Sequence, residues 1–464
     1  MYPGLGRRSR FCLKALFLIL TLLPVLTSCS GFVAEPRRAD FYIVGYLNER
    51  DLESQIAVSQ IVERIPEINA ALIKLFPGQL EAIKASGKVR YLFKPKEYHW
   101  LYPEVITGQS LTDFQWHLNF INVNALWQWG LGNNVTVSLL DTGIDATHQD
   151  LRGTILPGID AATGAALPND RDFSEGSVHG THVAGIVGAH GEVVGVAPRA
   201  KILPVRIFNP NYVGDFKAAA ALVAAHKAGA SIFNLSFGGF EYSPVLQDAI
   251  SFLVEKGDWV VAAAGNRGDS RPFYPAAMPG VVAVGALDGQ GRMADFSNRG
   301  LWVDVFAPGV NIYSTVPGNR YAFLSGTSMA APIVTGIAAA LRERRPNLDP
   351  WGLAWLFKHY GVNTRFLLAN LSNAPKGGCL RLQLTSSHGP VQNAWVRLLY
   401  ADEHDSYSAS SMSDLQGYVS FYAIPQGDAR VSITADFGGA TRIHYVPLTV
   451  YRNCSWVEKI ELPF

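Results

Sequence analysis

Hydrophobic and polar residues follow a different pattern in each of four successive parts of the chain. The first part contains a continuous apolar run, ALFLILTLLPVL at residues 15–26, and basic residues precede it at positions 7, 8, 10 and 14. A charged start followed by an apolar run too short to cross a membrane comfortably is typical of an export signal. We therefore predict that residues 1–28 are a signal peptide.

The second part, residues 29–111, combines strand-like and helix-like patterns in a short space. Residues 41–47, FYIVGYL, predict a strand, the apolar spacing over 53–65 predicts a helix, and residues 88–100 predict a further extended segment. We expect a small α+β domain that ends in a linker.

In the third part, residues 112–373, apolar β-branched runs alternate with Ala-rich helical stretches. The runs are residues 134–141, 201–208, 230–237, 258–265 and 280–287. Strands that alternate with helices indicate a mainly parallel sheet whose two faces are both covered. This pattern predicts a three-layer α/β fold.

The fourth part, residues 377–464, contains short alternating strands separated by Gly, Pro and Asp turns, and a linker at 373–378 precedes it. This pattern predicts a small all-β sandwich. The segment resembles the transthyretin-like or carboxypeptidase-regulatory β-sandwich, which implies hairpins at the Asp-x-x-Gly of residues 414–417 and the Pro-x-Gly of 425–427. The sequence does not choose among adhesion, substrate delivery and stability as its role.

Charge and cysteine content narrow the class of protein. With 39 basic and 38 acidic residues, the chain has no strong basic field, so we expect no nucleic-acid partner. Cys379 and Cys454 stand near the two ends of the fourth part, which in an exported chain predicts one disulfide between them. Two free buried thiols are the alternative.

Three candidate catalytic residues lie in the third part. Asp141 ends an apolar run, His179 begins a predicted helix, and Ser328 stands among Gly and Ala at the start of another. A serine hydroxyl attacks a carbonyl only when an imidazole takes its proton, and a buried carboxylate then fixes the imidazole tautomer. Asp, His and Ser are the residue types that this chemistry requires.

The motifs around these residues, DTGID, HGTHVAG and GTSMAAP, resemble in sequence and order the signatures of the subtilisin-like serine proteases. The order Asp, His, Ser differs from that of the α/β-hydrolases and of chymotrypsin. The resemblance implies an exported serine endopeptidase that cleaves polypeptides through an acyl-enzyme. The alternatives are a catalytically silent envelope protein that binds peptides, and a lipase or esterase, which fits the nucleophile but not the motif order.

Further positions match the family and take their roles from it. Asn266, in AAAGN, would donate to the oxyanion together with the Ser328 backbone N–H. The resemblance also implies a substrate-binding cleft, lined by Ser236, Phe237, Gly238, Ala263 and Gly265. His182 forms an H-x-x-H with His179, but it matches a structural position of the family motif, so we interpret it as a packing residue.

Two regions depart from the family pattern. The loop in which many relatives bind calcium offers only His190 and Glu192 here, so we expect no metal or other cofactor, although Asp150 matches a calcium carboxylate of the relatives. In the predicted specificity region, Arg267 follows Asn266 and Phe273 lies nearby, which suggests poor use of basic P1 residues. A solvated Arg and a packed Phe are the alternative.

The N-terminal parts resemble a lipoprotein signal and an inhibitor-type prosegment. LTSC at residues 26–29 resembles a lipoprotein box, which implies lipid on Cys29 and a place in the bacterial cell envelope. An ordinary cleaved signal is the alternative, and the spacing of a twin-arginine signal is lacking. Residues 29–111 would assist folding, inhibit the protease and be cut off by it between about residues 98 and 112. A permanent N-terminal domain is the alternative. The cut would leave the lipid on the prosegment and release the protease to the periplasm or exterior.

Overall fold

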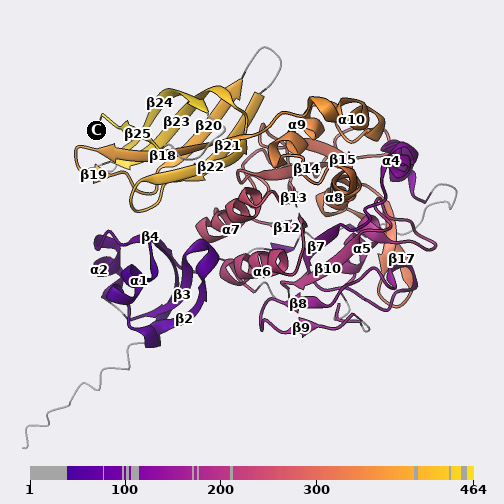
Figure 1. The fold of residues 1–464 in the computed structure, drawn as a ribbon, viewed down its shortest axis with the longest axis horizontal. Helices are drawn as coiled ribbons and strands as arrows, with labels where there is room; N and C mark the ends of the chain where they lie inside the picture. Colours follow the sequence, from indigo (N-terminus) through magenta and orange to yellow (C-terminus); the bar gives the residue numbers. More distant parts are fainter. Residues whose placement is uncertain are drawn as a thin grey trace, which may run out of the picture. The chain divides into compact units, whose positions relative to one another are not determined.

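The computed structural model describes residues 39–463, except 77, 97–98, 101–103, 106–113, 170–171, 175–176, 209–212, 402–405, 438–439 and 451–456 (Figure 1). The predicted signal peptide with Cys29, and also Cys454, lie outside the described residues. Within the described ranges, no helix is both long and apolar enough to cross a membrane.

Residues 40–93 form an antiparallel sheet in the order β2-β3-β1-β4 with two short helices. The elements are β1 (Asp40–Tyr46), α1 (Glu49–Gln55), β2 (Ile61–Ile65), β3 (Ala70–Leu75), α2 (Gln79–Ala85) and β4 (Val89–Phe93). The helix predicted over residues 53–65 is wrong beyond Gln55, where α1 ends, and Ile61–Ile65 pairs with β3 as a strand. Its β-branched residues suit a strand as well as a helix, and pairing with β3 decides between them.

The centre of the fold is an eight-stranded sheet in the order β15-β14-β13-β11-β7-β10-β8-β9. Its strands are β7 (Thr136–Asp141), β8 (Gly158–Asp160), β9 (Ala166–Leu167), β10 (Lys201–Arg206), β11 (Ile232–Leu235), β13 (Trp259–Ala263), β14 (Val281–Leu287) and β15 (Val305–Pro308). All neighbours are parallel except β8 and β9. The prediction of a mainly parallel sheet is confirmed.

The two faces of this sheet are buried under different helices. In β7, Val137 and Leu139 belong to a core shared with α5 and α8, whereas Leu140 belongs to a second core shared with α6 and α7. The helices are α3 (Trp116–Phe120), α4 (Val123–Trp129), α5 (His179–Gly188), α6 (Asp215–Lys227), α7 (Pro244–Glu255), α8 (Thr327–Arg344), α9 (Pro350–Tyr360) and α10 (Thr364–Asn370). Because side chains alternate along a strand, apolar residues on both sides require two covering layers. The predicted three-layer α/β fold is therefore confirmed.

Two further sheets form residues 378–461 and share one buried apolar cluster. One contains β18 (Gly378–Ser386), β19 (Gly389–Pro390), β22 (Tyr418–Ile424) and β25 (Glu458–Glu461), and the other β20 (Trp395–Ala401), β21 (Ser406–Met412), β23 (Gly427–Phe437) and β24 (Ala440–Val450). The expected hairpins are wrong, because residues 414–417 and 425–427 each connect strands of different sheets. A turn motif specifies the local reversal but not which neighbour the next strand joins.

Candidate active site

Asp141 and His179 are in direct contact. Asp141 is the last residue of β7, His179 is the first residue of α5, and the Nδ1 of His179 lies 2.7 Å from Oδ1 of Asp141. The backbone N–H of Thr142 donates to the same carboxylate oxygen at 2.7 Å. Both side chains are buried, so the carboxylate is held by hydrogen bonds in a site of low dielectric. It can fix the imidazole tautomer in which Nδ1 carries hydrogen.

Ser328 reaches the same edge of the sheet from α8. It is the second residue of that helix, and its Oγ donates to the carbonyl oxygen of Ser236 at 3.3 Å. Ser236 directly follows β11, in which Leu235 is paired with Leu140 of β7. Ser236 and Asp141 are therefore the next residues on neighbouring parallel strands, about 4.8 Å apart. The three predicted catalytic residues thus gather at the carboxyl end of the central strands.

A buried polar network fixes β11 against α8. Asn234 donates through Nδ2 to the Oγ of Ser236 at 2.9 Å and accepts through Oδ1 from the hydroxyl of Thr335 at 2.8 Å. Ser236 Oγ in turn donates to the carbonyl of Ser328 at 3.2 Å. The side chain of Ser236 therefore holds α8, the helix that carries Ser328. Only the backbone of Ser236 is left to line the substrate cleft that the sequence predicted.

Asn266 is held against the start of α8 by Thr327. The backbone N–H and the hydroxyl of Thr327 both donate to Oδ1 of Asn266, at 2.9 and 2.7 Å. The amide nitrogen Nδ2 lies on the side of Gly326, where an added Cβ would come within 3.0 Å of it. Ser328 is in the first turn of α8, so its backbone N–H has no acceptor within the helix. This arrangement can present two donors to a developing oxyanion.

Sequence reasoning missed Asn298, which organises the segment that carries Asn266. Its Oδ1 accepts from the backbone N–H groups of Arg267 and Asp269, both at 3.0 Å, and its Nδ2 donates to the Ala264 carbonyl at 2.8 Å. The side chain is fully buried. A polar residue buried in this way must be hydrogen-bonded, but no local pattern shows which loop it holds.

Two residues predicted to line the substrate cleft, Ala263 and Gly265, are buried or hydrogen-bonded inside the protein. Ala263 is buried at the end of β13. The N–H of Gly265 donates to the Thr327 hydroxyl at 3.0 Å, and its carbonyl accepts from the Asn298 backbone at 2.9 Å. The backbone of Gly265 therefore holds the oxyanion segment in place.

The other two predicted cleft residues, Phe237 and Gly238, form the short strand β12, and this strand is paired with another strand of the chain. This partner is β5 (His99–Trp100), paired antiparallel with Phe237 opposite Trp100 and Gly238 opposite His99. A second short strand, β6 (Glu104–Val105), pairs antiparallel with β17 (Arg320–Ser325), the strand that precedes α8. Peptide chain is therefore bound by strand addition at Phe237–Gly238, next to Ser236, and at the strand that leads into Ser328.

Phe273 fills space between the two segments of the predicted cleft. It is buried, and a Cβ on Gly238 would meet its ring at 2.4 Å and one on Gly265 at 3.1 Å. The ring also makes an edge contact with Phe240, at 5.3 Å between centroids. Arg267 is exposed. The ring therefore limits the depth available to a side chain that enters between Gly238 and Gly265.

The residues present do not fit a calcium site of the kind found in relatives. Asp150 is buried, and its Oδ2 accepts from the Val193 N–H at 2.8 Å and from the Tyr321 hydroxyl at 3.0 Å. His190 and Glu192, in the same loop, are exposed. The described residues contain no cluster of three or more His, Cys, Asp or Glu side chains that could hold a metal. Asp150 thus holds the short loop directly through its backbone.

His182 and Cys379 both make contacts that stabilise the structure. Burial lowers the pKa of His182 to about 3, and its Nε2 contacts the carbonyls of Ile312 at 3.0 Å and Ala322 at 3.1 Å. Its neutral imidazole therefore joins α5 to β16 (Ile312–Val316) and β17. Cys379 is disulfide-bonded, and its predicted partner Cys454 lies outside the described residues.

Comparison with known proteins places this site in a family. Residues 132–376 match the subtilase family, and the chain belongs to that family. The chain is 35% identical to fervidolysin of Fervidobacterium pennivorans over 379 residues, which are 68% of this chain and 54% of that protein. It is 45% identical to the thermophilic serine proteinase of Bacillus sp. (strain AK1) over 216 residues, 46% of this chain and 53% of that one. The chain thus spans about half the length of each.

The solved structures agree with this assignment. The crystal structure of fervidolysin, described as a keratinolytic enzyme related to subtilisin, matches 91% of this chain and 78% of its own, with a TM-score of 0.77 and 28% identity. The subtilisin-like fold predicted from the motifs is therefore confirmed, and the structural similarity to fervidolysin extends beyond residues 132–376 to most of the chain.

Proposed function

We propose that this protein is an exported serine endopeptidase that hydrolyses polypeptides through an acyl-enzyme. The observation that carries the proposal is the meeting of Asp141, His179 and Ser328 at one edge of the sheet, with peptide chain paired to β12 and to β17, the strand that leads into α8. The named protease relatives support it.

The proposed mechanism assigns one task to each group. His179 takes the proton of the Ser328 hydroxyl as Oγ attacks the substrate carbonyl, while Asp141 stabilises the imidazolium that forms. Asn266 Nδ2 and the Ser328 N–H receive the negative charge on the carbonyl oxygen. His179 then gives the proton to the leaving amine. In the second half of the reaction, His179 takes a proton from water as the water attacks the acyl carbonyl, and it returns the proton to Ser328 Oγ as the acyl group leaves. No metal or other cofactor takes part in any step.

A fluorophosphonate probe tests this proposal directly. We expect the probe to label Ser328 in the processed protein, and Ser328→Ala to remove both labelling and casein hydrolysis. A folded, processed protein that is not labelled would favour the catalytically silent peptide-binding alternative. Turnover of long-chain esters at a rate comparable to casein would favour the lipase or esterase alternative.

We further propose that the prosegment predicted over residues 29–111 inhibits the enzyme, and that the enzyme cuts itself within that range. The β5 strand occupies β12, the edge on which a substrate would pair, so the enzyme is blocked until this strand leaves. The prosegment sheet also shares an apolar core with α6 and α7, through Ile43, Ile65, Ile68, Ala70 and Tyr91. These contacts resist spontaneous opening.

The two strand pairings bound the segment that is cut. β5 ends at Trp100, beside β12, and β6 begins at Glu104, beside β17, the strand that precedes α8. We expect cleavage between residues 100 and 104, and mass spectrometry of the processed protein should find the new N-terminus in that interval.

We propose, lastly, that lipid on Cys29 holds the precursor in the cell envelope until the cut. The LTSC motif and the place of Cys29 before the prosegment support this. We expect the Ser328→Ala precursor in the membrane fraction and the processed wild-type protease outside it. An active, uncut wild type in the membrane fraction would instead make Cys29 a permanent anchor.

A further inference from the structure

The turn at residues 414–417 is a rigid feature of the C-terminal sheets. Oδ1 of Asp414 accepts from the N–H groups of Gln416 at 2.9 Å and Tyr418 at 2.8 Å. Gly417 has a φ of 77°, and a Cβ there would lie 2.2 Å from the Leu384 carbonyl oxygen, so only glycine fits. The two residues between them, Leu415 and Gln416, are therefore presented in one conformation.

This turn binds the open edge of the prosegment sheet. The edge strand is β4, and the Leu415 N–H donates to the Arg90 carbonyl at 2.5 Å. The side-chain amide of Gln416 donates to the Val89 carbonyl and, at 3.4 Å, to that of Gly87. An edge strand has backbone carbonyls without hydrogen-bond donors from a neighbouring strand. Here the 414–417 turn supplies donors to them.

Leu415 also completes the core of the prosegment. Its side chain is only 8% exposed, and it belongs to the apolar cluster that contains Tyr46, Leu52, Ile83 and Val89. These four residues all come from the prosegment. A leucine at the tip of a turn would be exposed without that core, so its burial depends on the prosegment being bound.

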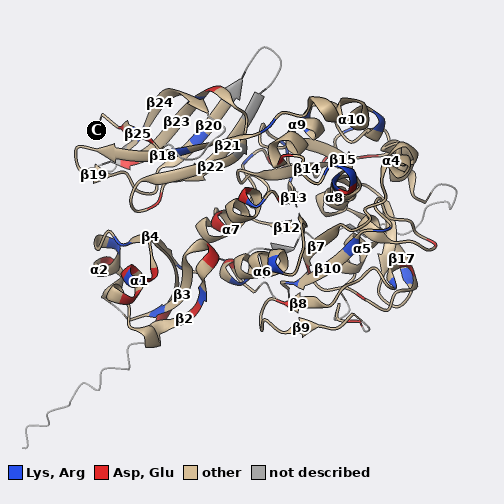
Figure 2. Cartoon of the chain, in the orientation of Figure 1, with Lys and Arg blue, Asp and Glu red and all other residues tan. Residues whose placement is uncertain are grey.

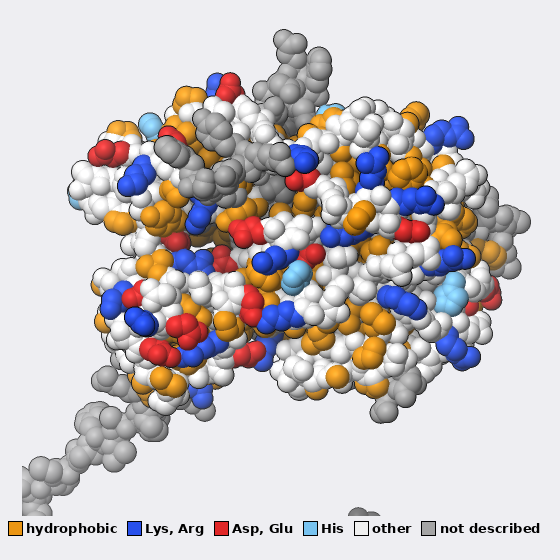
Figure 3. All heavy atoms as spheres, in the orientation of Figure 1, with side chains coloured by type: hydrophobic (Ala, Val, Ile, Leu, Met, Phe, Trp, Pro, Cys, Tyr) orange, Lys and Arg blue, Asp and Glu red, His pale blue; other side chains and the backbone are white. Residues whose placement is uncertain are grey.

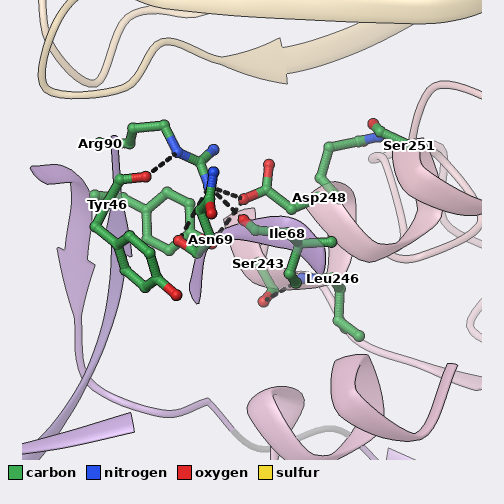
Figure 4. Close-up of polar contacts among 10 residues, drawn as sticks. Tyr46, Ile68, Asn69, Arg90, Ser243, Leu246, Asp248 and Ser251 are labelled. Atoms are coloured by element: carbon green, nitrogen blue, oxygen red, sulfur yellow. Dashed lines mark hydrogen bonds and ion pairs between the residues drawn. The ribbon is translucent and has the colours of Figure 1, made fainter. Parts of the chain in front are cut away.

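Next to the turn, the prosegment contacts α7 (Figure 4). Arg90 donates to Asp248 Oδ2 at 2.8 Å, and the Tyr91 hydroxyl donates to the same oxygen at 2.7 Å. Arg90 also donates to the Ile68 carbonyl at 2.7 Å, which anchors its guanidinium within the prosegment. On the same side of the prosegment, Lys217 of α6 forms an ion pair with Glu63 of β2 at 2.5 Å, and Lys227 of α6 pairs with Glu67, just after β2 (Figure 2).

The C-terminal sheets are themselves bound to the catalytic part. The hydroxyls of Tyr242 and Ser411 lie 2.9 Å apart, and the Trp395 ring contacts Tyr242 at 5.4 Å and stacks on Tyr274 at 6.2 Å between centroids. A cavity of about 600 Å³ lies between the three parts, lined by residues that include Arg90, Asp248 and Ser411. The turn and Asp248 therefore belong to one body when the prosegment is no longer covalently attached.

We propose that the C-terminal β-domain is a second binding site for the prosegment, in addition to the catalytic part. The cut prosegment then dissociates only when its contacts with the 414–417 turn also break. This inference rests on the proposed self-processing, because it concerns the step that follows the cut. While the prosegment stays bound at one site, its effective concentration at the other site is high. A contact that breaks at one site therefore re-forms quickly. The C-terminal domain thereby delays the appearance of activity.

The test separates this binding site from self-processing. A Ser328→Ala full-length chain receives the recognition sequence of an unrelated protease within residues 106–113 and is cut there by that protease. The cut complex is immobilised through a C-terminal tag, and release of the prosegment is followed in buffer. Leu415→Ala should release it on the order of 30-fold faster, because about three buried carbon groups are lost.

Ile443→Ala is the matched control, since it removes a side chain of the same size that is 57% exposed on β24 of the same domain. It should release the prosegment at the rate of the parent chain. Gln416→Ala, which keeps Leu415 in the core, should accelerate release by about fivefold and decides the question if Leu415→Ala does not fold. Equal release from parent, Leu415→Ala and Gln416→Ala would overturn the proposal. A wild-type chain that never cuts itself would instead refute self-processing and leave these rates unaffected.

Discussion

Thr327 holds Asn266 with two hydrogen bonds to one oxygen, from its backbone N–H at 2.9 Å and from its hydroxyl at 2.7 Å. The same hydroxyl accepts from the Gly265 N–H at 3.0 Å. Thr327 is therefore a positioning residue that fixes the direction of the Asn266 amide before any charge develops. A serine at this position would keep the hydroxyl and all three hydrogen bonds, whereas a valine would keep the shape and the backbone N–H bond but lose both bonds of the hydroxyl.

We predict that Thr327→Val lowers kcat by about tenfold and leaves KM nearly unchanged, because the loosened amide stabilises the transition state less while substrate pairing is untouched. Steady-state kinetics on a peptide amide measures both constants. Thr327→Ser should restore most of the loss. A loss in Thr327→Ser without a loss in Thr327→Val would show that the methyl group, and not the hydroxyl, matters.

Phe273 is predicted to restrict the P1 residue. Phe273→Ala should raise kcat/KM for substrates with a large aromatic P1 by about 10- to 100-fold relative to those with alanine, because the buried ring no longer fills the space between Gly238 and Gly265. A peptide library read by mass spectrometry measures the preference. In the wild type, dominance of Lys or Arg at P1 would reject the expectation of poor basic P1 use, and an unchanged profile in Phe273→Ala would show that the ring lies outside the pocket.

We predict that stability does not depend on calcium. EDTA should leave the Tm unchanged, because the Asp150 carboxylate already holds its loop through the Val193 N–H. Asp150→Ala should lower the free energy of unfolding by about 2–3 kcal/mol, since that buried N–H loses its acceptor. Differential scanning calorimetry with and without EDTA measures both effects. A large drop in Tm with EDTA that calcium reverses would contradict the prediction.

Asp414 should make the precursor less stable as pH rises through the range between about 4 and 6. Burial is the main cause that raises its pKa to about 6, and Asp248 adds to the shift, whereas the Tyr418 and Gln416 N–H groups and Arg90 oppose it. The folded precursor therefore holds the proton more tightly than the unfolded chain, whose Asp pKa is about 4, so the stability that this proton provides is lost in that window.

Thermal melts of the Ser328→Ala precursor at several pH values measure this effect. Asp414→Asn keeps the Oδ1 acceptor of the turn but cannot ionise, so its Tm should decline less between pH 4 and pH 6.5 than that of the parent. Asp436→Asn, an exposed position on β23, is the control and should keep the parent slope. The same decline in the parent and in Asp414→Asn would assign the effect to another group.

Charged side chains of both signs lie on the surface. On the face drawn in Figure 3, Lys and Arg side chains lie among Asp and Glu side chains. The full sequence has 39 basic and 38 acidic residues, so the two signs nearly balance. The partners proposed above are polypeptides, which would bind by strand pairing and shape.

Local errors of the sequence predictions have a common cause. Residues 61–65 were expected to be helical but pair with β3, and the turns at 414–417 and 425–427 were expected to be hairpins but connect different sheets. In each case the local pattern allowed two outcomes, and a strand distant in sequence selected one.

The sequence by itself determined the class of fold and the family. Alternating apolar runs and helical stretches specify a parallel sheet, because this periodicity reflects burial of each element on its own. The motifs around Asp141, His179 and Ser328 indicate the subtilase family, and they also predict the nucleophile and its base, because that reaction requires those side chains. Only the tertiary structure assigned Asn298 to the oxyanion segment and Leu415 to the core of the prosegment. Their roles arise from contacts between residues far apart in the chain, and no local pattern records the partner.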